Sequence, residues 1–296
     1  MADLTSEQLI ALSRLFSSSV VREMARWKRS PLFALLAGQS GLPEILPVST
    51  PVRNLFELAF ALLQREGFRH EYIYKAALTQ KVLLGKHSLR TAAMLTEFRV
   101  CGCKADLAIL NGTSTVYEVK SERDSLNRLE RQVAAYAEVF AKIYVIAAEI
   151  HVDAIACSVP KDIGILRLNG RHQISSLREA VELPERTSPA SIFDSIRTDE
   201  ARLVLELHGF RIPNVPNTLL NSVLRPMFVK LGSRRAHDGM VEVLRTTRSL
   251  MPLSDLVDQL PSSLRTAALS VPLRKADHSR LVAAINTPLD AAMAWG

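Results

Sequence analysis

The chain has 296 residues, of which 48% are hydrophobic and 23% are charged, and this composition is typical of globular proteins. Its 37 Lys and Arg residues outnumber 30 Asp and Glu residues, giving a formal net charge of +7, a modest excess that is compatible with a polyanionic partner. The sequence contains no apolar run of the roughly 18 residues that a membrane helix needs. Three cysteines and an N-terminus without signal-peptide character favour a cytoplasmic protein.

The first part of the chain is predicted to be helical. Residues 5–27 carry apolar side chains at helical spacing after Thr5, which has the chemistry of an N-cap. Glycines and prolines interrupt residues 38–51 and indicate a connection. A second helix is expected after Thr50-Pro51, and a third from His70 to Leu84.

The pattern then becomes extended. Strands are predicted over residues 94–100, 104–110 and 115–120, and Asn111-Gly112 is a strong hairpin signal between the last two. An amphipathic helix is expected from about Arg123 to Ala141, followed by strands over 143–148 and 163–168. This order predicts an α/β fold with a mixed sheet and helices packed on it.

Prolines punctuate the rest of the chain and separate short helical segments. We expect helices over residues 199–207, 218–231 (broken or kinked at Pro226) and 238–248. The sequence therefore divides into a helical N-terminal segment with its linker, an α/β domain and an all-helical C-terminal domain. Their expected bounds are residues 1–50, 51–183 and 190–296.

Three charged residues on the predicted hairpin form the first candidate site. Asp106 interrupts an apolar strand, and Glu118 and Lys120 lie two residues apart on the returning strand, so they share one face. The hairpin brings that face beside Asp106. Because buried charges are costly unless they pair or bind a cation, two carboxylates here suit Mg²⁺. Lys120 would then hold the attacking water or stabilise negative charge on a phosphate.

The predicted helix after the hairpin adds polar residues to this site. Gln132 and Tyr136 are four residues apart and share one face, and Arg128 lies one turn earlier. Arg128 is a natural phosphate ligand. On spacing alone, an ordinary helix face explains Gln132 and Tyr136 as well as a role in the site does.

Asp106, then Glu118-Val119-Lys120, then Gln132-x-x-x-Tyr136 resemble the PD-(D/E)XK nuclease superfamily, and the run from Glu97 to Val145 is similar to its mostly uncharacterised bacterial sce-type family. The resemblance implies a restriction-endonuclease-like αβββαβ core and a metal-dependent nuclease acting on DNA more often than on RNA. It makes Asp106 and Glu118 ligands of Mg²⁺, with Mn²⁺ as a substitute, Lys120 the catalytic lysine and Glu97 the acid preceding the core. Lys104 stands where similar sequences commonly carry Arg, and the proline of the superfamily's name is absent.

Four basic residues are candidates for contacting the nucleic-acid backbone, namely Lys104, Arg128, Arg234 and Arg235. A solvated surface explains the C-terminal pair equally well. Alternatively, the charges on the hairpin are ordinary structural ion pairs, in which Asp106 and Glu118 pair with Lys104 and Lys120. A second hypothesis for the whole protein is a catalytically silent regulator that binds nucleic acid or a partner on a nuclease-like scaffold. A protein partner or a homodimer also remains open, and none of the seven histidines is assigned a catalytic role.

Overall fold

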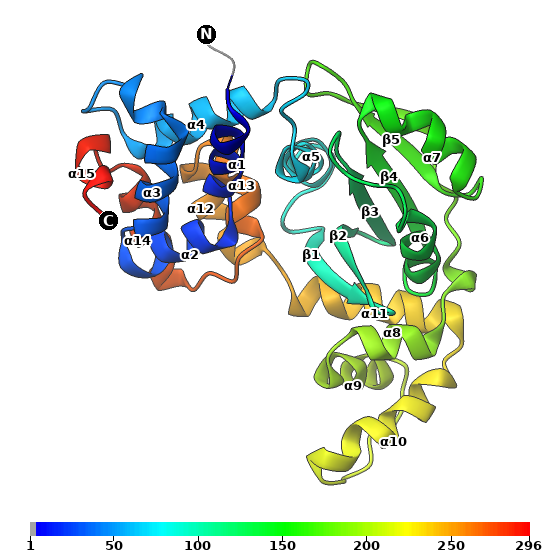
Figure 1. Cartoon of the computed structure of the whole chain (residues 1–296). Coiled ribbons are helices and arrows are strands. Elements are labelled where there is room, and N and C mark those ends of the chain that lie inside the picture. Colours follow the sequence, from blue (N-terminus) through cyan, green and yellow to red (C-terminus); the bar gives the residue numbers. More distant parts are fainter. Residues whose placement is uncertain (1–3) are drawn as a thin grey trace. The chain divides into compact units, whose positions relative to one another are not determined.

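A computed structural model describes residues 4–296, which form two compact units (Figure 1). The first unit combines the residues up to Gln80 with Gly170–His172 and Met251–Gly296. The second combines Lys81–Asn169 with Gln173–Leu250. Among the described residues, no helix has the length and apolar character required to cross a membrane.

The first unit is all-helical, and its helices come from both ends of the chain. In chain order they are α1 (Ser6–Leu15), α2 (Ser18–Trp27), α3 (Pro31–Ser40), η1 (Leu42–Glu44), α4 (Val52–Leu63), α5 (Glu71–Leu78), η5 (Met251–Leu253), α12 (Ser254–Gln259), α13 (Ser262–Leu269), α14 (Lys275–Ile285) and α15 (Leu289–Met293). The π-helical turn η2 (Thr79–Leu83) follows α5.

Local capping divides the first helical stretch in two. The Thr5 hydroxyl accepts the Gln8 N–H, and the Gln8 side chain accepts the Thr5 N–H, so the expected N-cap is confirmed as a capping box. The helical character expected of residues 5–27 is confirmed, but it is divided between two helices, α1 and α2. Ser17 adopts an extended conformation and caps a new helix, α2.

The second unit contains a six-stranded mixed sheet in the order β1-β2-β3-β4-β5-β6. The strands are β1 (Ala93–Val100), β2 (Cys103–Leu110), β3 (Ser114–Lys120), β4 (Lys142–Ala147), β5 (Gly164–Leu168) and β6 (Ile174–Arg178). Pairing is antiparallel from β1 to β3 and between β5 and β6, and parallel from β3 through β4 to β5. The predicted mixed α/β class is therefore confirmed, while β6 was missed because its sequence, ISSLR, is short and largely polar.

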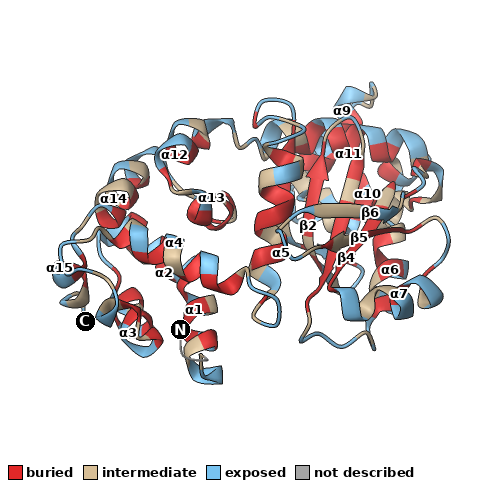
Figure 2. Ribbon diagram, turned by 90° about the horizontal axis from the view of Figure 1, so that it is seen from above, coloured by how far each residue is buried: buried red, intermediate tan, exposed pale blue. Residues whose placement is uncertain are grey.

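Helices close the second unit. They are α6 (Leu129–Ala137), η3 (Glu149–His151), α7 (Val152–Ser158), η4 (Pro184–Arg186), α8 (Pro189–Ser195), α9 (Thr198–Leu207), α10 (Asn217–Val229) and α11 (Ser233–Thr247). The helices α6 and α7 are the crossovers that parallel strands require. The strands β1–β5 are buried over most of their length, whereas β6 has no buried residue (Figure 2). One continuous apolar core joins β1–β5 to α6, α8, α9, α10 and α11.

Two expected helices differ in length from the sequence pattern. The helix expected over residues 123–141 is confined to α6, because Asp124 accepts hydrogen bonds from the backbone N–H and the hydroxyl of Ser121 and holds a turn after β3. Pro226 lies inside α10, which continues to Val229.

The structure also divides the chain differently from the three parts expected at residues 1–50, 51–183 and 190–296. The helices α8–α11 pack on the sheet, whereas α12–α15 pack with the N-terminal helices. Hydrophobic periodicity marks each helix but does not say which neighbour covers its apolar face.

Candidate active site

The two hairpin strands separate at the point where their acidic residues lie. Paired residues of β2 and β3 run from Leu110–Ser114 to Leu107–Tyr117. Asp106 and Glu118 come directly after that last pair. Instead of a strand carbonyl, Oδ2 of Asp106 accepts the N–H of Val119 at 2.8 Å. Asp106 is thereby fixed beside β3 while its side chain stays only half-buried.

Glu118 and Lys120 form a buried ion pair. Lys120 Nζ donates to Glu118 Oε1 at 2.8 Å, and the two side chains are only 5% and 2% exposed. The same ammonium group donates to Gln132 Oε1 of α6 at 3.0 Å. The lysine is therefore held by partners from two elements, which offsets part of the cost of burying its charge.

Tyr136 holds the other side of the same carboxylate. Its hydroxyl oxygen lies 2.6 Å from Glu118 Oε2 and 2.9 Å from the backbone oxygen of Lys104, and its one hydrogen serves these two acceptors. Burial, followed by the negative charge of Glu118, raises the pKa of Tyr136 well above its usual range. The hydroxyl therefore remains protonated and acts as a donor.

Glu97 sits on an irregularity in β1. It has a left-handed backbone, with φ of 55°, and lies between Thr96 and Phe98, which pair with Leu107 and Ala105 of β2. The β1–β2 register is the same on both sides of Glu97, so Glu97 lies opposite Asp106 of β2. The Glu97 carboxylate is exposed and pairs with Lys104 at 2.8 Å. One of its oxygens lies within 4.8 Å of a carboxylate oxygen of Asp106.

The donor set fits a hard divalent cation. Asp106 and Glu97 offer carboxylate oxygens near one another, and Glu118 lies on the strand beside Asp106. Mg²⁺ prefers oxygen ligands, is commonly held by one or two carboxylates and keeps several waters. The residues present thus suit a magnesium ion at the half-exposed side of the buried Glu118–Lys120 pair.

The structure brings Asp106, Glu118, Lys120, Gln132 and Tyr136 together, as the sequence spacing predicted. One of the two structural ion pairs considered as an alternative is present, because Glu118 pairs with Lys120. Lys104 pairs with Glu97 instead of Asp106.

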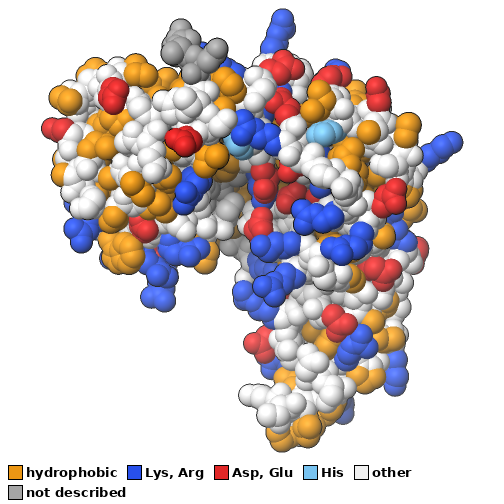
Figure 3. All heavy atoms as spheres, viewed as in Figure 1, with side chains coloured by type: hydrophobic (Ala, Val, Ile, Leu, Met, Phe, Trp, Pro, Cys, Tyr) orange, Lys and Arg blue, Asp and Glu red, His pale blue; other side chains and the backbone are white. Residues whose placement is uncertain are grey.

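Of the expected nucleic-acid contacts, Lys104 lies at this site, where it pairs with Glu97 and its backbone oxygen lies 2.9 Å from the Tyr136 hydroxyl oxygen. Arg128 is exposed at the start of α6, outside the Gln132–Lys120 contact. Arg234 pairs with Glu185 and Asp238 on the surface, and the neighbouring Arg235 is exposed. In the view of Figure 3, basic and acidic side chains are interspersed on the visible surface.

A second polar cluster was not found by sequence reasoning. The Ser114 hydroxyl lies 2.8 Å from His237 Nε2, and His237 Nδ1 lies 2.8 Å from Asp238 Oδ1. The order resembles a nucleophile relay, but Ser114 and His237 are buried, and Ser114 also accepts the Ala141 N–H at 3.0 Å. The cluster therefore connects β3, the start of β4 and α11, and serves the fold. Its members lie far apart in the sequence, so no spacing signal marks it.

Fold and site together define an α/β protein with a six-stranded mixed sheet and a buried carboxylate–lysine pair at the point where two strands separate. The family described as Bacteriophage P4 protein cII matches residues 64–221, which is more than half of the chain. The chain belongs to this family.

Individual relatives are similar over shorter stretches. Protein cII of Enterobacteria phage P4 is 32% identical over 98 residues, which cover 32% of this chain and 36% of that protein. The chain thus matches about a third of the length of this relative. Among solved structures, the SPO1766 protein of unknown function from Silicibacter pomeroyi is 22% identical and covers 40% of this chain and 80% of that one, with a TM-score of 0.27.

Proposed function

We propose that this protein is a metal-dependent nuclease that hydrolyses phosphodiester bonds in nucleic acid, with DNA favoured over RNA. The observation that carries the proposal is the contact set around Glu118 and Lys120. Two polar residues of α6, Gln132 and Tyr136, bond to this pair, and Asp106 of the neighbouring strand accepts the backbone N–H of the residue between them. A fold needs no such collection of charges for its stability, because an apolar core does the same at lower cost.

The order of elements supports the same proposal. The chain runs through α5, the antiparallel strands β1, β2 and β3, the helix α6, and the strand β4 parallel to β3. This is the αβββαβ order of the restriction-endonuclease-like core that the sequence resembles. In that interpretation Asp106 and the Glu118-Val119-Lys120 run occupy the strands that carry the site in the superfamily.

Each residue has a physical task in the proposed reaction. Asp106 and Glu118 would hold Mg²⁺, or Mn²⁺ as a substitute, with Glu97 beside them, and the bound ion would neutralise phosphate charge and acidify a water. Lys120 would orient the attacking water and stabilise negative charge developing on the phosphate. Gln132 and Tyr136 position Lys120 and Glu118 through their hydrogen bonds.

One observation favours the second hypothesis, a catalytically silent scaffold that binds nucleic acid or a partner. Both carboxylate oxygens of Glu118 already have internal partners, Lys120 on one side and Tyr136 on the other. A metal would have to share or displace these contacts. This hypothesis predicts nucleic-acid binding that needs no divalent cation.

Cleavage assays distinguish the two hypotheses. We would incubate the full chain with single- and double-stranded DNA and RNA in Mg²⁺, Mn²⁺ or EDTA, beside the variants Asp106→Asn and Lys120→Met and the surface control Lys161→Gln. We expect metal-dependent cleavage that falls at least about 100-fold in both site variants and is unchanged in the control. Melting temperatures of each variant would show whether lost activity reflects lost folding. Metal-independent cleavage, or equal cleavage by Asp106→Asn, would contradict the nuclease proposal.

A further inference from the structure

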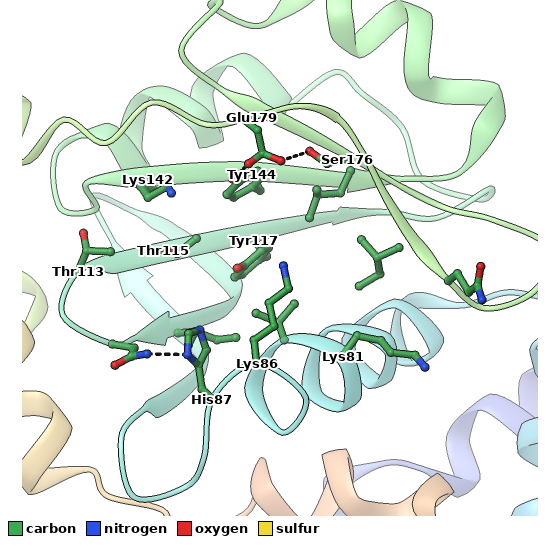
Figure 4. A pocket seen from close by; sticks show the side chains of 16 residues that line it. Lys81, Lys86, His87, Thr113, Thr115, Tyr117, Lys142, Tyr144, Ser176 and Glu179 are labelled. Atoms are coloured by element: carbon green, nitrogen blue, oxygen red, sulfur yellow. Dashed lines mark hydrogen bonds between the residues drawn. The ribbon is translucent and has the colours of Figure 1, made fainter.

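The face of the sheet opposite the Glu118–Lys120 pair carries a hollow of about 650 Å³ (Figure 4). Side chains alternate between the faces of a strand, so Thr115 and Tyr117 of β3 point away from Glu118 and Lys120. The pairing of Tyr117 with Tyr144 continues this second face onto β4. The hollow lies wholly within the second unit, and its volume falls in the range of small-molecule sites.

Positive charge gathers around this hollow. Lys81 and Lys86 reach it from η2 and the turn that follows, and Lys142 reaches it from β4. Within residues 4–296, none of these three ammonium groups has a carboxylate within ion-pairing distance. Glu179 is the single carboxylate among the lining residues. The hollow therefore has a net positive charge and favours an anion.

A pair of aromatic rings forms its floor. Tyr117 and Tyr144 are stacked, with ring centroids 5.6 Å apart and an angle of 12° between their planes. Gly164 on β5 makes room for this arrangement, because a Cβ at that position would lie 2.3 Å from the Tyr144 ring. The rings consequently present a fixed apolar edge beside the lysines, a combination suited to a flat, charged ligand.

Fixed polar groups complete the lining. Glu179 accepts hydrogen bonds from the Ser176 hydroxyl and, at 2.6 Å, from the Tyr144 hydroxyl. These hydrogen bonds, together with Lys142 and Lys86, lower the pKa of Glu179, so the carboxylate is ionised at neutral pH. The Asn111 amide donates to His87 Nδ1 at 2.6 Å, which leaves the ring hydrogen on Nε2. An oriented acceptor and oriented donors thus lie beside the cations.

We propose that this hollow binds a nucleotide. Lys86, which lies between the other two lysines in Figure 4, would contact its phosphate, since lysine acts on phosphates as a point charge, and Lys81 and Lys142 would add positive charge at the two ends of the hollow. The base would pack against the tyrosine pair, and Glu179 would accept hydrogen bonds from a hydroxyl or amino group of the ligand. The nucleotide is either free or one unit of a nucleic-acid strand, because both present the same phosphate and base.

This second site is independent of the proposed catalysis. Asp106, Glu118 and Lys120 belong to the other face of the sheet, and none of them lines the hollow. No metal ligand of the proposed nuclease is needed for the binding. Binding can therefore be measured in EDTA, where metal-dependent cleavage does not operate, and its outcome does not depend on the nuclease proposal.

Calorimetric titration of the full chain in EDTA tests the proposal. The probes are the four nucleoside 5′-monophosphates, the matching nucleosides, inorganic phosphate and a trinucleotide that supplies the same chemistry within a strand. We expect saturable binding of a nucleotide from one or both sources. The double variant Lys86→Gln/Lys142→Gln should bind at least about tenfold more weakly. Lys161→Gln should bind with unchanged affinity, since this residue does not line the hollow.

Three results would overturn the proposal. They are no binding of any nucleotide, equal binding of inorganic phosphate and nucleotides, and unchanged affinity in the double lysine variant. The substituted lysines carry exposed or half-exposed side chains, so both variants should fold, and their melting temperatures verify this. Tighter binding of the trinucleotide would identify the nucleic-acid strand as the source, and tighter binding of a monophosphate would identify the free nucleotide.

Discussion

At the scale of single residues, the central feature is a buried charge pair with two polar neighbours. Glu118 is held by Lys120 and Tyr136, and Lys120 by Glu118 and Gln132. Burying two charges costs more than burying two apolar side chains of similar size, and a good geometry recovers only part of that cost. We interpret the pair as a feature kept for chemistry at the expense of stability.

A double-mutant cycle tests this interpretation. Lys120→Met should destabilise the protein by about 3–5 kcal/mol, because it leaves the Glu118 carboxylate buried without its cation. Adding Glu118→Gln should restore much of that loss, since the amide is uncharged and still accepts from Tyr136. Urea unfolding of the two single variants and the double variant measures the coupling. Strictly additive losses would show that the two charges do not depend on each other.

At the scale of elements, the second unit is held at the start of β3 by a buried hydroxyl. Ser114 bonds to the backbone of Ala141 just before β4 and to His237 of α11. It thus joins two neighbouring strands to a helix more than a hundred residues further along the chain. This contact fixes the end of β3 opposite to the one that carries Lys120.

Ser114→Ala should therefore lower the free energy of unfolding by about 1–3 kcal/mol, because the Ala141 N–H and the His237 ring lose their buried partner. The matched control is Ser222→Ala on the exposed face of α10, which should change stability by no more than about 0.5 kcal/mol. Thermal or urea unfolding measures both. Equal stability of the two variants would mean that the buried contact contributes nothing.

At the scale of the whole molecule, the two units have separate cores, and different spectroscopic signals follow their unfolding. Trp27 and Trp295, the chain's two tryptophans, both belong to the first unit. In the second unit, Glu200 of α9 is buried and accepts two hydrogen bonds from Arg248, at 2.8 and 2.7 Å. Tryptophan fluorescence thus follows the first unit, while circular dichroism follows both.

The Glu200–Arg248 pair predicts acid sensitivity of the second unit. Burial works to raise the pKa of Glu200, but hydrogen bonds from Arg248 and the Arg197 backbone outweigh it, and the net effect lowers the pKa. A carboxyl whose folded pKa lies below its unfolded value stabilises the fold above the unfolded pKa, near 4.5, and this stabilisation is lost as the pH falls further. The stability difference between the wild type and Glu200→Gln should therefore be largest near pH 7 and shrink below about pH 4.5. Urea unfolding followed by circular dichroism at pH 7, 5 and 3 measures this, and a difference independent of pH would contradict it.

The strands β1–β5 and the charged set could be predicted because their signals are local. Alternating apolar residues and Asn111-Gly112 mark the hairpin, and the two-residue spacing of Glu118 and Lys120 places both on one face. The four-residue spacing of Gln132 and Tyr136 placed these two side chains together on α6 in the same way. Register and helical period are properties of neighbouring residues, so the sequence displays them directly.

Other features depend on packing between distant segments and could not be read from local patterns. Glu97 has a left-handed backbone inside a strand, which no residue propensity predicts for a glutamate. The assignment of α12–α15 to the N-terminal helices depends on which apolar faces meet. The hollow behind the sheet is built from β3, β4, β6 and the turn after η2, whose residues share no motif.

The division of the chain has a consequence for its synthesis. The second unit is a continuous insertion in the first, apart from the short Gly170–His172 excursion, because the first unit needs both residues before Lys81 and residues after Leu250. A ribosome releases the N-terminal helices long before α14, against which α2 packs. The inserted unit can therefore complete its core before the helices that pack on the N-terminal ones have been synthesised. The N-terminal helices would be exposed to chaperones for most of translation.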